Sequence, residues 1–395
     1  MTRSARRFEV PDTVPYRKGD RWGFVNQAGD TVVPFEYGFT SPFVEGRASV
    51  LDRTTRLGTY LDRDGQPITP FIYDKVVPFQ HGLGLVMLDG KWGALDEDGE
   101  IVIVPQYDRI HLDDFPEYGF IYAKKDNKWG VINKDNEEII PHKYDNLGHG
   151  GFKDGYMWAV ENNQEGYIND KFEWTISPKK DRRFGGRSDE GLILVMENGK
   201  YGYMNEIGDT IIPFQYDDAA IFDSGLAPVR FNYGDPYYYF IDKTGKKIDS
   251  IKAYSVGEFV NGIADVGVEG NTSAYINTDF EKIFEGEYVI RRFEDKYATI
   301  QTMGDSPLYG LIDRKGTVII EPSYEFLAYL ENHDLVMFRE NGLMGLMTVE
   351  QEVIHPATLN DIEFGIVGNH GLLLTYPSNG KEGYINNRGE VYYED

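Results

Sequence analysis

The chain contains no cysteine, although it is 395 residues long. Disulfide bonds, thiolate catalysis and zinc sites with cysteine ligands are therefore excluded. Long apolar runs are also missing, since no segment approaches the roughly 20 apolar residues that cross a bilayer. Arg3, Arg6 and Arg7 are not followed by the apolar stretch that a secretory signal requires. These absences predict a soluble protein of the cytoplasm.

Basic residues are scarce relative to acidic ones. The chain has 40 Lys and Arg against 65 Asp and Glu, which gives a formal net charge of −25. This surplus disfavours binding to nucleic acids and anionic lipids through bulk charge, and it favours solubility or a basic partner. Apolar residues make up 41% of the chain and aromatic residues 14%, so the composition is that of a folded protein.

One unit of sequence recurs along the chain, and its clearest copy runs from Gly84 to Asp108. Three short apolar runs in it are separated by turn signals. Asp89-Gly90 suits a tight two-residue hairpin, and Asp96 to Gly99 suits a type I turn followed by a left-handed glycine. The last run ends at Pro105, which cannot donate a ladder hydrogen bond. The unit therefore predicts a three-stranded antiparallel meander.

An Asp or Asn at the start of the second turn marks the phase of the repeat. From Asn26 to Asn386, ten steps cover 360 residues, so the mean period is 36 and the chain holds eleven units. The third residue before the marker is glycine except at Thr59, Tyr239 and Ala274. A glycine inside a strand usually marks a bulge or the close approach of another backbone. The markers are Asn26, Asp62, Asp96, Asn133, Asn169, Asn205, Asp242, Asn277, Asp313, Thr348 and Asn386.

Trp22-Gly23, Trp92-Gly93 and Trp129-Gly130 resemble the WG, or KWG, repeats of many bacterial proteins. The resemblance covers nearly all of the chain and is weakest around Asn277 and Thr348. It implies a repeat fold but no particular activity, because the family is defined by its repeat alone. Tyr201-Gly202 and Tyr309-Gly310 are softened copies of the pair. A Pro and then a Tyr follow the pairs and these copies, at Pro34 and Tyr37, Pro105 and Tyr107, Pro141 and Tyr144, Pro213 and Tyr216, and Pro322 and Tyr324.

The repeats predict an all-β fold in which a short tail, residues 1–13, precedes an array of repeats over residues 14–395. We expect about eleven three-stranded antiparallel meanders with a period of 36, forming an open, curved superhelix like a β-solenoid. A propeller-like ring, or two such rings, is the alternative. The open form is favoured because propellers typically have about 4 to 8 blades, and because no blade is visibly divided between the two termini.

Basic residues cluster between residues 174 and 191 of this acidic chain. Lys179, Lys180, Arg182, Arg183 and Arg187 fall in one irregular stretch that contains two consecutive glycines. The simpler interpretation is a solvated connection between strands. The alternative is a contact surface for an anionic group, with Arg182, Arg183 and Arg187 as the candidate binding residues.

Aromatic residues supply the other candidate binding positions. Tyr237 and Tyr239 are expected on one face of a strand and Tyr238 on the other, because strand side chains alternate. Exposed tyrosines would form a binding platform. Trp158 and Trp174 lie outside the repeat phase, so the fold does not require them. By contrast, Trp22, Trp92 and Trp129 share one phase and are expected to fill equivalent core positions.

Motifs for catalysis or metal binding are not found. Asp62 to Gly65 and Asp96 to Gly99 resemble the start of a calcium loop, but the second lacks the glycine and glutamate that such a loop needs later. Both stretches are therefore interpreted as hairpin turns. His142 and His149 could reach one metal ion with a carboxylate, although a packed or surface histidine is the simpler interpretation. We expect no catalytic residue, cofactor or metal.

These observations favour a non-enzymatic scaffold that binds another macromolecule, with a protein as the favoured partner. The charge points to a basic partner, such as the toxin that an immunity protein neutralises. Binding of glycans or the cell envelope through aromatic side chains is one alternative. An enzyme whose site forms between repeats is another, since side chains from different units can converge in space.

Overall fold

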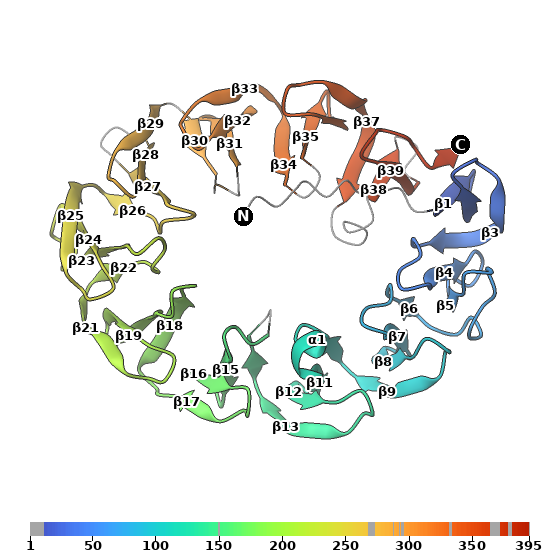
Figure 1. Cartoon of the computed structure of the whole chain (residues 1–395), viewed down its shortest axis with the longest axis horizontal. Coiled ribbons are helices and arrows are strands. Elements are labelled where there is room, and N and C mark those ends of the chain that lie inside the picture. Colours follow the sequence, from blue (N-terminus) through green and yellow to red (C-terminus); the bar gives the residue numbers. More distant parts are fainter. Residues whose placement is uncertain are drawn as a thin grey trace.

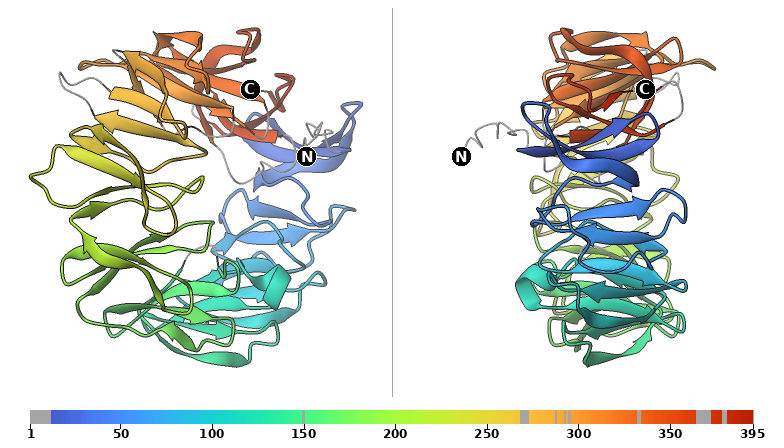
Figure 2. Two further views of the ribbon diagram at one scale, coloured as in Figure 1. Left: turned by 60° about the vertical axis from the view of Figure 1, so that its left-hand side comes forward. Right: turned by 90° about the vertical axis from the view of Figure 1, so that its right-hand side faces the viewer.

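The computed structural model describes residues 12–148, 151–267, 273–286, 288–291, 293, 296–331, 334–363, 372–377 and 381–394. Within these ranges the chain is almost entirely β, and its single helix, α1 (Phe115–Tyr118), is four residues long. No helix in the described residues is long and apolar enough to cross a membrane. The sheets stand side by side in a closed ring around a central opening (Figure 1). Seen from its edge, the ring is much narrower than it is wide (Figure 2).

Hydrogen bonding divides the described strands into nine sheets, seven with four strands and two with six. In the four-stranded sheets, the first strand lies nearest the central opening and the fourth on the outer wall (Figure 1). These sheets are β6 (Lys75–Val76), β7 (Gly84–Leu88), β8 (Lys91–Leu95) and β9 (Ile101–Tyr107); β10 (Arg109–His111), β11 (Ile121–Lys125), β12 (Lys128–Ile132) and β13 (Glu138–Tyr144); β14 (Asn146–Leu147), β15 (Tyr156–Glu161), β16 (Gln164–Asn169) and β17 (Trp174–Ile176); β18 (Arg182–Arg187), β19 (Ile193–Glu197), β20 (Lys200–Met204) and β21 (Thr210–Tyr216); β22 (Asp218–Ala219), β23 (Ala227–Arg230), β24 (Tyr237–Ile241) and β25 (Lys247–Lys252); β26 (Ser255–Val256), β27 (Ile263–Gly267), β28 (Ser273–Asn277) and β29 (Lys282–Gly286); and β30 (Tyr288–Ile290), β31 (Tyr297–Thr302), β32 (Tyr309–Asp313) and β33 (Val318–Tyr324).

The two six-stranded sheets hold the first and the last repeats. The first is ordered β40 (Tyr393–Glu394), β1 (Thr13–Lys18), β2 (Arg21–Asn26), β3 (Thr31–Thr40), β4 (Ala48–Asp52) and β5 (Gly58–Leu61). The other is ordered β34 (Phe326–Leu330), β35 (Leu335–Glu340), β36 (Leu343–Met347), β37 (Val353–Glu363), β38 (Leu372–Pro377) and β39 (Gly383–Asn386). In each, one long strand, β3 or β37, is the outer strand of one repeat and the inner strand of the next. The fold is thus a nine-bladed β-propeller ring whose first and last blades are double.

All eleven repeats keep the same turn at the phase marker. At each marker the backbone N–H donates to the carbonyl oxygen four residues later, as from Asn26 to Asp30 at 2.9 Å and from Asn386 to Glu390 at 3.0 Å. The predicted hairpin at Asp89-Gly90 is also confirmed, with φ of 51° and 73°. The prediction of three strands in each unit is wrong by one, because a single-repeat sheet has four strands. The innermost strand has only two or three residues in several sheets, which is too short to produce an apolar alternation.

The prediction of an open superhelix is wrong, because the two ends of the chain meet. β40 adds to β1 in parallel, with Tyr393 beside Arg17. The rings of Trp22 and Tyr384 pack edge to face with centroids 5.6 Å apart, and the Tyr384 hydroxyl donates to the Thr40 carbonyl at 3.1 Å. The first sheet therefore does contain strands from both termini. A two-residue closing strand leaves no recognisable pattern in the sequence.

The glycine of the WG pair is required by the outer strand that crosses it. A Cβ atom on Gly93 would lie 2.4 Å from the carbonyl oxygen of Ile103. The ladder is irregular there: Trp92 pairs with Tyr107 and Ala94 with Ile103, so the outer strand bulges. Seven glycines of the repeat have this close contact with the carbonyl oxygen of the residue ten positions later: Gly23, Gly93, Gly130, Gly166, Gly202, Gly310 and Gly345.

The core lies between neighbouring sheets. Trp22 and Trp129 are buried, and Trp92 is half-buried against the same kind of apolar cluster, as the shared phase predicted. Carboxylates also link one repeat to the next: Glu45 accepts from the backbone N–H groups of His81 and Gly82 at 2.9 and 2.8 Å. These contacts fix the angle between sheets.

Candidate functional site

The sheet β22–β25 departs from the repeat at three positions that act together. Tyr239 replaces the glycine of the WG pair, and Asp249 replaces the aliphatic residue whose carbonyl oxygen faces that glycine. Ser250 stands where other repeats have a proline. The β24–β25 ladder is therefore regular at these positions, with Tyr239 paired to Ser250 and Phe240 to Asp249, and its register shifts only at the next residue, Ile241. Prolines at the position of Ser250 are Pro34, Pro70, Pro141, Pro213 and Pro356.

The connection between β23 and β24 is also long. Six residues separate these strands, whereas two separate β7 from β8. The longer connection forms one wall of a pocket of about 250 Å³, which we call the tyrosine pocket. Tyr233 and Tyr254 are 69% and 66% exposed, and neighbouring Tyr237 is 43% exposed. The pocket is lined by Arg230, Tyr233, Gly234, Asp235, Pro236, Lys252, Ala253 and Tyr254.

Backbone hydrogen bonds hold the pocket in shape. The N–H of Tyr233 donates to Asp217 Oδ2 at 3.1 Å, and the N–H of Tyr237 donates to Asp235 Oδ1 at 3.0 Å. Across the pocket, the N–H of Ala253 donates to the Pro236 carbonyl at 3.1 Å. These bonds tie the connection to the end of β25, so the tyrosines are presented by a preformed structure.

Arg230 supplies the positive charge of the pocket. Its guanidinium carbon lies 5.2 Å from the ring centroid of Tyr233 and 4.7 Å from that of Tyr238. Its Nη2 is 3.5 Å from Asp218 Oδ2, while Nε is buried and has no hydrogen-bond partner among the described residues. Burial, and then the hydrogen bond to Asp218, raise the pKa of the Tyr238 hydroxyl. Tyr238 therefore stays a neutral donor under Arg230.

The three consecutive tyrosines alternate as predicted. Tyr238 is buried and Tyr237 exposed. Tyr239 is half-buried: its ring lies edge-on to Phe231 at 5.4 Å, and the Lys247 ammonium sits 3.8 Å above it. Of the two predicted binding tyrosines, Tyr237 directly follows the pocket residue Pro236. Tyr239 instead packs against Phe231 and Lys247.

The predicted basic cluster lies mainly on β18, the strand nearest the central opening. Its side chains meet carboxylates of this same chain. Arg182 Nη2 is 2.8 Å from Glu197 Oε2, and Lys179 contacts the same carboxylate. Together these two cations hold the pKa of Glu197 below its usual value. Arg183 lies 3.8 Å from Glu165, and Arg187 bridges Asp154 and Glu206 at 2.8 and 3.0 Å.

The two out-of-phase tryptophans lie between sheets. Trp158 is partly buried against the cluster that contains Tyr167 and Ile193. Trp174 is half-buried, and its ring lies edge-on to Tyr144 with centroids 6.0 Å apart. Neither is among the residues that line the tyrosine pocket.

The candidate metal site is only partly described. His142 Nδ1 lies 2.8 Å from Glu138 Oε2, and its ring stacks on Tyr107 with centroids 5.7 Å apart. His149 lies outside the described residues. Among the residues that the structure describes, no three His, Asp or Glu side chains gather to hold a metal ion. The two calcium-like stretches form turns in which Asp62 and Asp96 accept backbone N–H groups.

Sequence reasoning found Tyr237 and Tyr239 but missed Arg230, Tyr233, Lys252 and Tyr254. The available signal was the loss of three repeat positions in a single unit, together with its lengthened connection. Each change is unremarkable alone, and only their pairing across β24 and β25 shows that they belong together.

Comparison with known proteins supports the repeat and the fold. The model of the WG containing repeat matches residues 22–52, 59–92, 92–129, 129–164, 166–201, 201–233 and 309–343, which together exceed half of the chain. β24 and β25 lie outside these matched ranges. No curated protein matches.

Two solved structures were compared with this chain, and only the first has a TM-score above 0.5. A eukaryotic initiation factor is 11% identical with a TM-score of 0.52, over 79% of this chain and 95% of that one. BamB from Moraxella catarrhalis is 11% identical with a TM-score of 0.28, over 69% and 95% of the two chains. An identity of 11% limits the first comparison to the fold. The similarity in fold supports a closed ring and not an open superhelix.

Proposed function

This chain belongs to the family of WG containing repeat proteins, and we propose that it is a non-enzymatic scaffold that binds another protein through the tyrosine pocket. The observation that carries the proposal is the group of exposed tyrosines around Arg230. Tyrosine and arginine dominate the residues that contribute most to protein–protein affinity. Tyrosine in particular offers a large apolar face and a polar tip.

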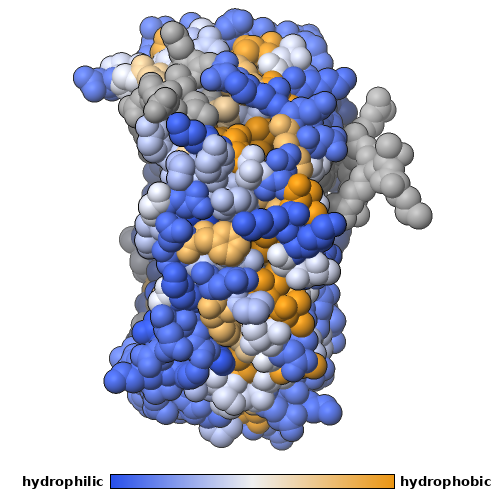
Figure 3. Space-filling view, turned by 90° about the vertical axis from the view of Figure 1, so that its left-hand side faces the viewer, coloured by the Kyte–Doolittle hydropathy of each residue, from blue (hydrophilic) through white to orange (hydrophobic). Residues whose placement is uncertain are grey.

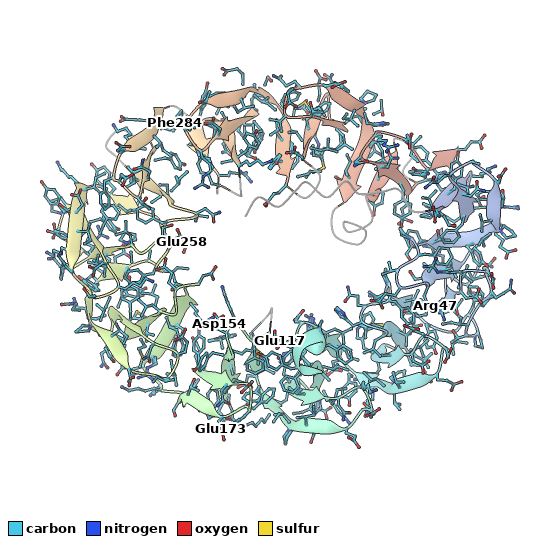
Figure 4. The ribbon with its side chains drawn as sticks, in the orientation of Figure 1. Arg47, Glu117, Asp154, Glu173, Glu258 and Phe284 are labelled. Carbon is cyan, nitrogen blue, oxygen red and sulfur yellow. The ribbon has the colours of Figure 1, made fainter. Side chains whose placement is uncertain are left out.

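The overall charge favours a basic partner. A net charge of −25 attracts a positively charged protein over long range and speeds its association. Carboxylates also surround the central opening, where Glu117, Asp154 and Glu258 lie at the inner rim (Figure 4). An immunity protein that neutralises a basic toxin would have these properties.

The test is affinity capture from the lysate of the native cell with four baits: wild type, Tyr233→Ala/Tyr254→Ala, Ile207→Ala, and an unrelated acidic protein. Ile207 is 61% exposed but lies in a marker turn away from the pocket, so it is a matched control. We expect one basic protein to be retained by wild type and by Ile207→Ala. The double tyrosine variant should bind the purified partner at least about tenfold more weakly, as loss of interface hot spots does.

Retention of the same partner by the double variant at unchanged affinity would contradict the pocket as the docking site. Capture of only acidic proteins, or of none, would contradict the basic-partner proposal. Binding that weakens as salt rises from 50 to 300 mM would support steering by charge, because exposed charges are screened within about 10 Å at 0.1 M salt.

A second candidate is glycan binding at the same pocket. Tyr233 and Tyr254 expose ring faces on which a sugar can stack, while Arg230, Lys252 and Asp235 offer partners for hydroxyl groups. A glycan array probed with the same baits tests this candidate. Retention of an oligosaccharide by wild type and Ile207→Ala but not by the tyrosine variant, with no protein captured, would move the function to glycan binding.

A further inference from the structure

We infer that the partner protein docks as an extended segment that adds to the outer edge of β25 as a further strand. This inference rests on the proposed function and specifies how the partner binds. Its basis is that β25 lacks both the proline and the bulge over the WG glycine that interrupt most other outer strands. An exposed edge with unpaired backbone groups is a template for another strand.

Most outer strands elsewhere in the ring are interrupted. A proline removes a backbone donor in the outer strand of most repeats, and a bulge over the WG glycine bends that strand. In β25 the proline position holds Ser250 and the glycine position opposite holds Tyr239. Its aliphatic anchor is replaced by Asp249, which is exposed. The result is a strand of six residues that pairs regularly with β24 from Asp249 to Lys252, with a register shift at Ile248. Only Ile251 in it is partly buried.

β25 also lies in the open. It forms part of the outer wall (Figure 1), and the space-filling view of this side shows apolar side chains gathered in a band between hydrophilic ones (Figure 3). Ile248 of β25 is 45% exposed. β29 likewise lacks a proline, but its Phe284 is half-buried and stacks on Tyr288 with centroids 6.2 Å apart.

One hydrogen bond shows which backbone groups face outward. The N–H of Ala253 donates to the Pro236 carbonyl at 3.1 Å, so these two residues form a hydrogen-bonded pair. The N–H of Ser250 donates to its neighbour Asp249 Oδ1 at 2.7 Å. In an antiparallel ladder the groups of alternate residues point to opposite sides. Counted back from Ala253, the backbone groups of Lys252 and Ser250 therefore face away from β24, toward an added strand. The four regularly paired residues, Asp249 to Lys252, span about 13 Å, which sets the minimum length of the docked segment.

Local charge indicates the chemistry of that segment. The edge and the adjacent pocket carry the cations Arg230, Lys247 and Lys252. Their two carboxylates accept hydrogen bonds from this chain: Asp249 from the N–H of Ser250, and Asp235 from the N–H of Tyr237 and the hydroxyl of Tyr239. A segment that pairs with β25 would place one end beside Lys252 and the tyrosine pocket. We assign to it an apolar residue beside the exposed Ile248 and an acidic or tyrosine side chain at the pocket end.

Peptide display on the full chain tests the inference. Random twelve-residue peptides are selected on wild type, and the enriched peptides are synthesised with a fluorescent label. Their affinities are then measured for wild type, Ser250→Pro, Ser250→Ala and Tyr233→Ala/Tyr254→Ala. Ser250→Pro installs the residue that five other repeats carry and removes one outward N–H. We expect at least tenfold weaker binding by Ser250→Pro and less than twofold change for Ser250→Ala.

N-methylated peptides provide a measurement that does not depend on folding of a variant. Methylation of alternate backbone nitrogens blocks one edge of the peptide strand. Methylation of one alternate set of peptide nitrogens should abolish binding to wild type, and methylation of the other set should be tolerated. Strand addition would be overturned if peptides methylated on either alternate set of nitrogens bound equally well. Unchanged peptide affinity for Ser250→Pro would also overturn it. Because Ser250→Pro could loosen β25, Ile248→Lys is the second variant, and both must keep the thermal midpoint of wild type.

The outcomes separate the two proposals. Loss of peptide binding in the tyrosine variant but not in Ser250→Pro would leave the pocket as the docking site and refute the edge. Loss of binding in Ser250→Pro but not in the tyrosine variant would retain the edge and refute the pocket. A wild type that elutes as a dimer while Ser250→Pro elutes as a monomer would identify a second copy as the occupant and overturn the inferred partner segment.

Discussion

A Cβ atom placed on Gly93 would lie 2.4 Å from the carbonyl oxygen of Ile103, which is closer than side chains approach a backbone oxygen. In seven repeats, including this one, a Cβ atom on the glycine would meet the carbonyl oxygen of the residue ten positions later. It gives the glycine of the WG pair a physical role: the bulged outer strand passes directly over it. Replacing this glycine must therefore displace backbone.

Gly93→Ala is expected to destabilise the protein by about 1–3 kcal/mol, the usual cost of overpacking a close contact. Ala274→Gly is the control, because Ala274 pairs with Glu285 in a repeat without this bulge. It should cost only about 0.5–1 kcal/mol, from the added chain entropy of glycine. Thermal denaturation followed by circular dichroism compares the two. Equal losses would show that the close approach is unimportant.

Thr59 replaces the glycine in the second repeat and meets the same carbonyl group differently. Its Oγ1 donates to the Thr69 carbonyl at 2.8 Å and lies 2.7 Å from Thr69 Oγ1. Thr59→Val keeps the shape but leaves these buried groups unpaired, so we expect a loss of about 1–3 kcal/mol in the free energy of unfolding. Urea denaturation measures it. Thr59→Ser, which keeps the hydroxyl, should lose less, and the opposite order would contradict the assignment.

Closure of the ring depends on Tyr384. Tyr384→Phe removes only the hydrogen bond to Thr40 and should cost about 1 kcal/mol. Tyr384→Ala also removes the contact with Trp22 and should cost about 3–5 kcal/mol, as truncation of a buried aromatic residue does. Small-angle X-ray scattering should then show a larger radius of gyration for Tyr384→Ala, because the first and last repeats separate. An unchanged radius would mean that β40 alone holds the ring.

Acid should weaken the contact between β18 and β19. Lys179 and Arg182 lower the pKa of Glu197 below its ordinary value of 4.5. The ionised carboxylate therefore stabilises the fold above the pKa of the unfolded chain, and this contribution disappears as the pH falls through the lowered value. Glu197→Gln should have a lower thermal midpoint than wild type at pH 6, and the difference should shrink toward pH 3. A difference that stays constant with pH would exclude this titration as its cause.

The local parts of the fold were predictable because their causes are local. The turn at Asn26 and its ten equivalents follows from a side chain that bonds to the backbone a few residues later. Alternating apolar residues give the second, third and fourth strands of each unit. The innermost strands were not predictable, because β6 and β14 have two residues each and pair only when the neighbouring elements are in place.

The candidate site was predictable only in part for the same reason. Tyr237 and Tyr239 are visible as a run of aromatic residues. Arg230 and Tyr254 become part of one pocket only through the pairing of β23, β24 and β25, which brings the ends of these strands together. The ion pairs of Arg182 and Arg187 likewise involve carboxylates from other segments, Glu197 in β19 and Glu206 in the turn after β20.

The amino-acid sequence by itself determined the repeat, its period of 36, its turns and its all-β character, since each depends on interactions within one unit. Only the tertiary structure decided that the array closes. Closure depends on the angle between neighbouring sheets, which packing sets separately at each contact and which accumulates around the ring. Trp22 meets Tyr384 because those angles sum to a full turn, and no residue pattern within a single repeat encodes that sum.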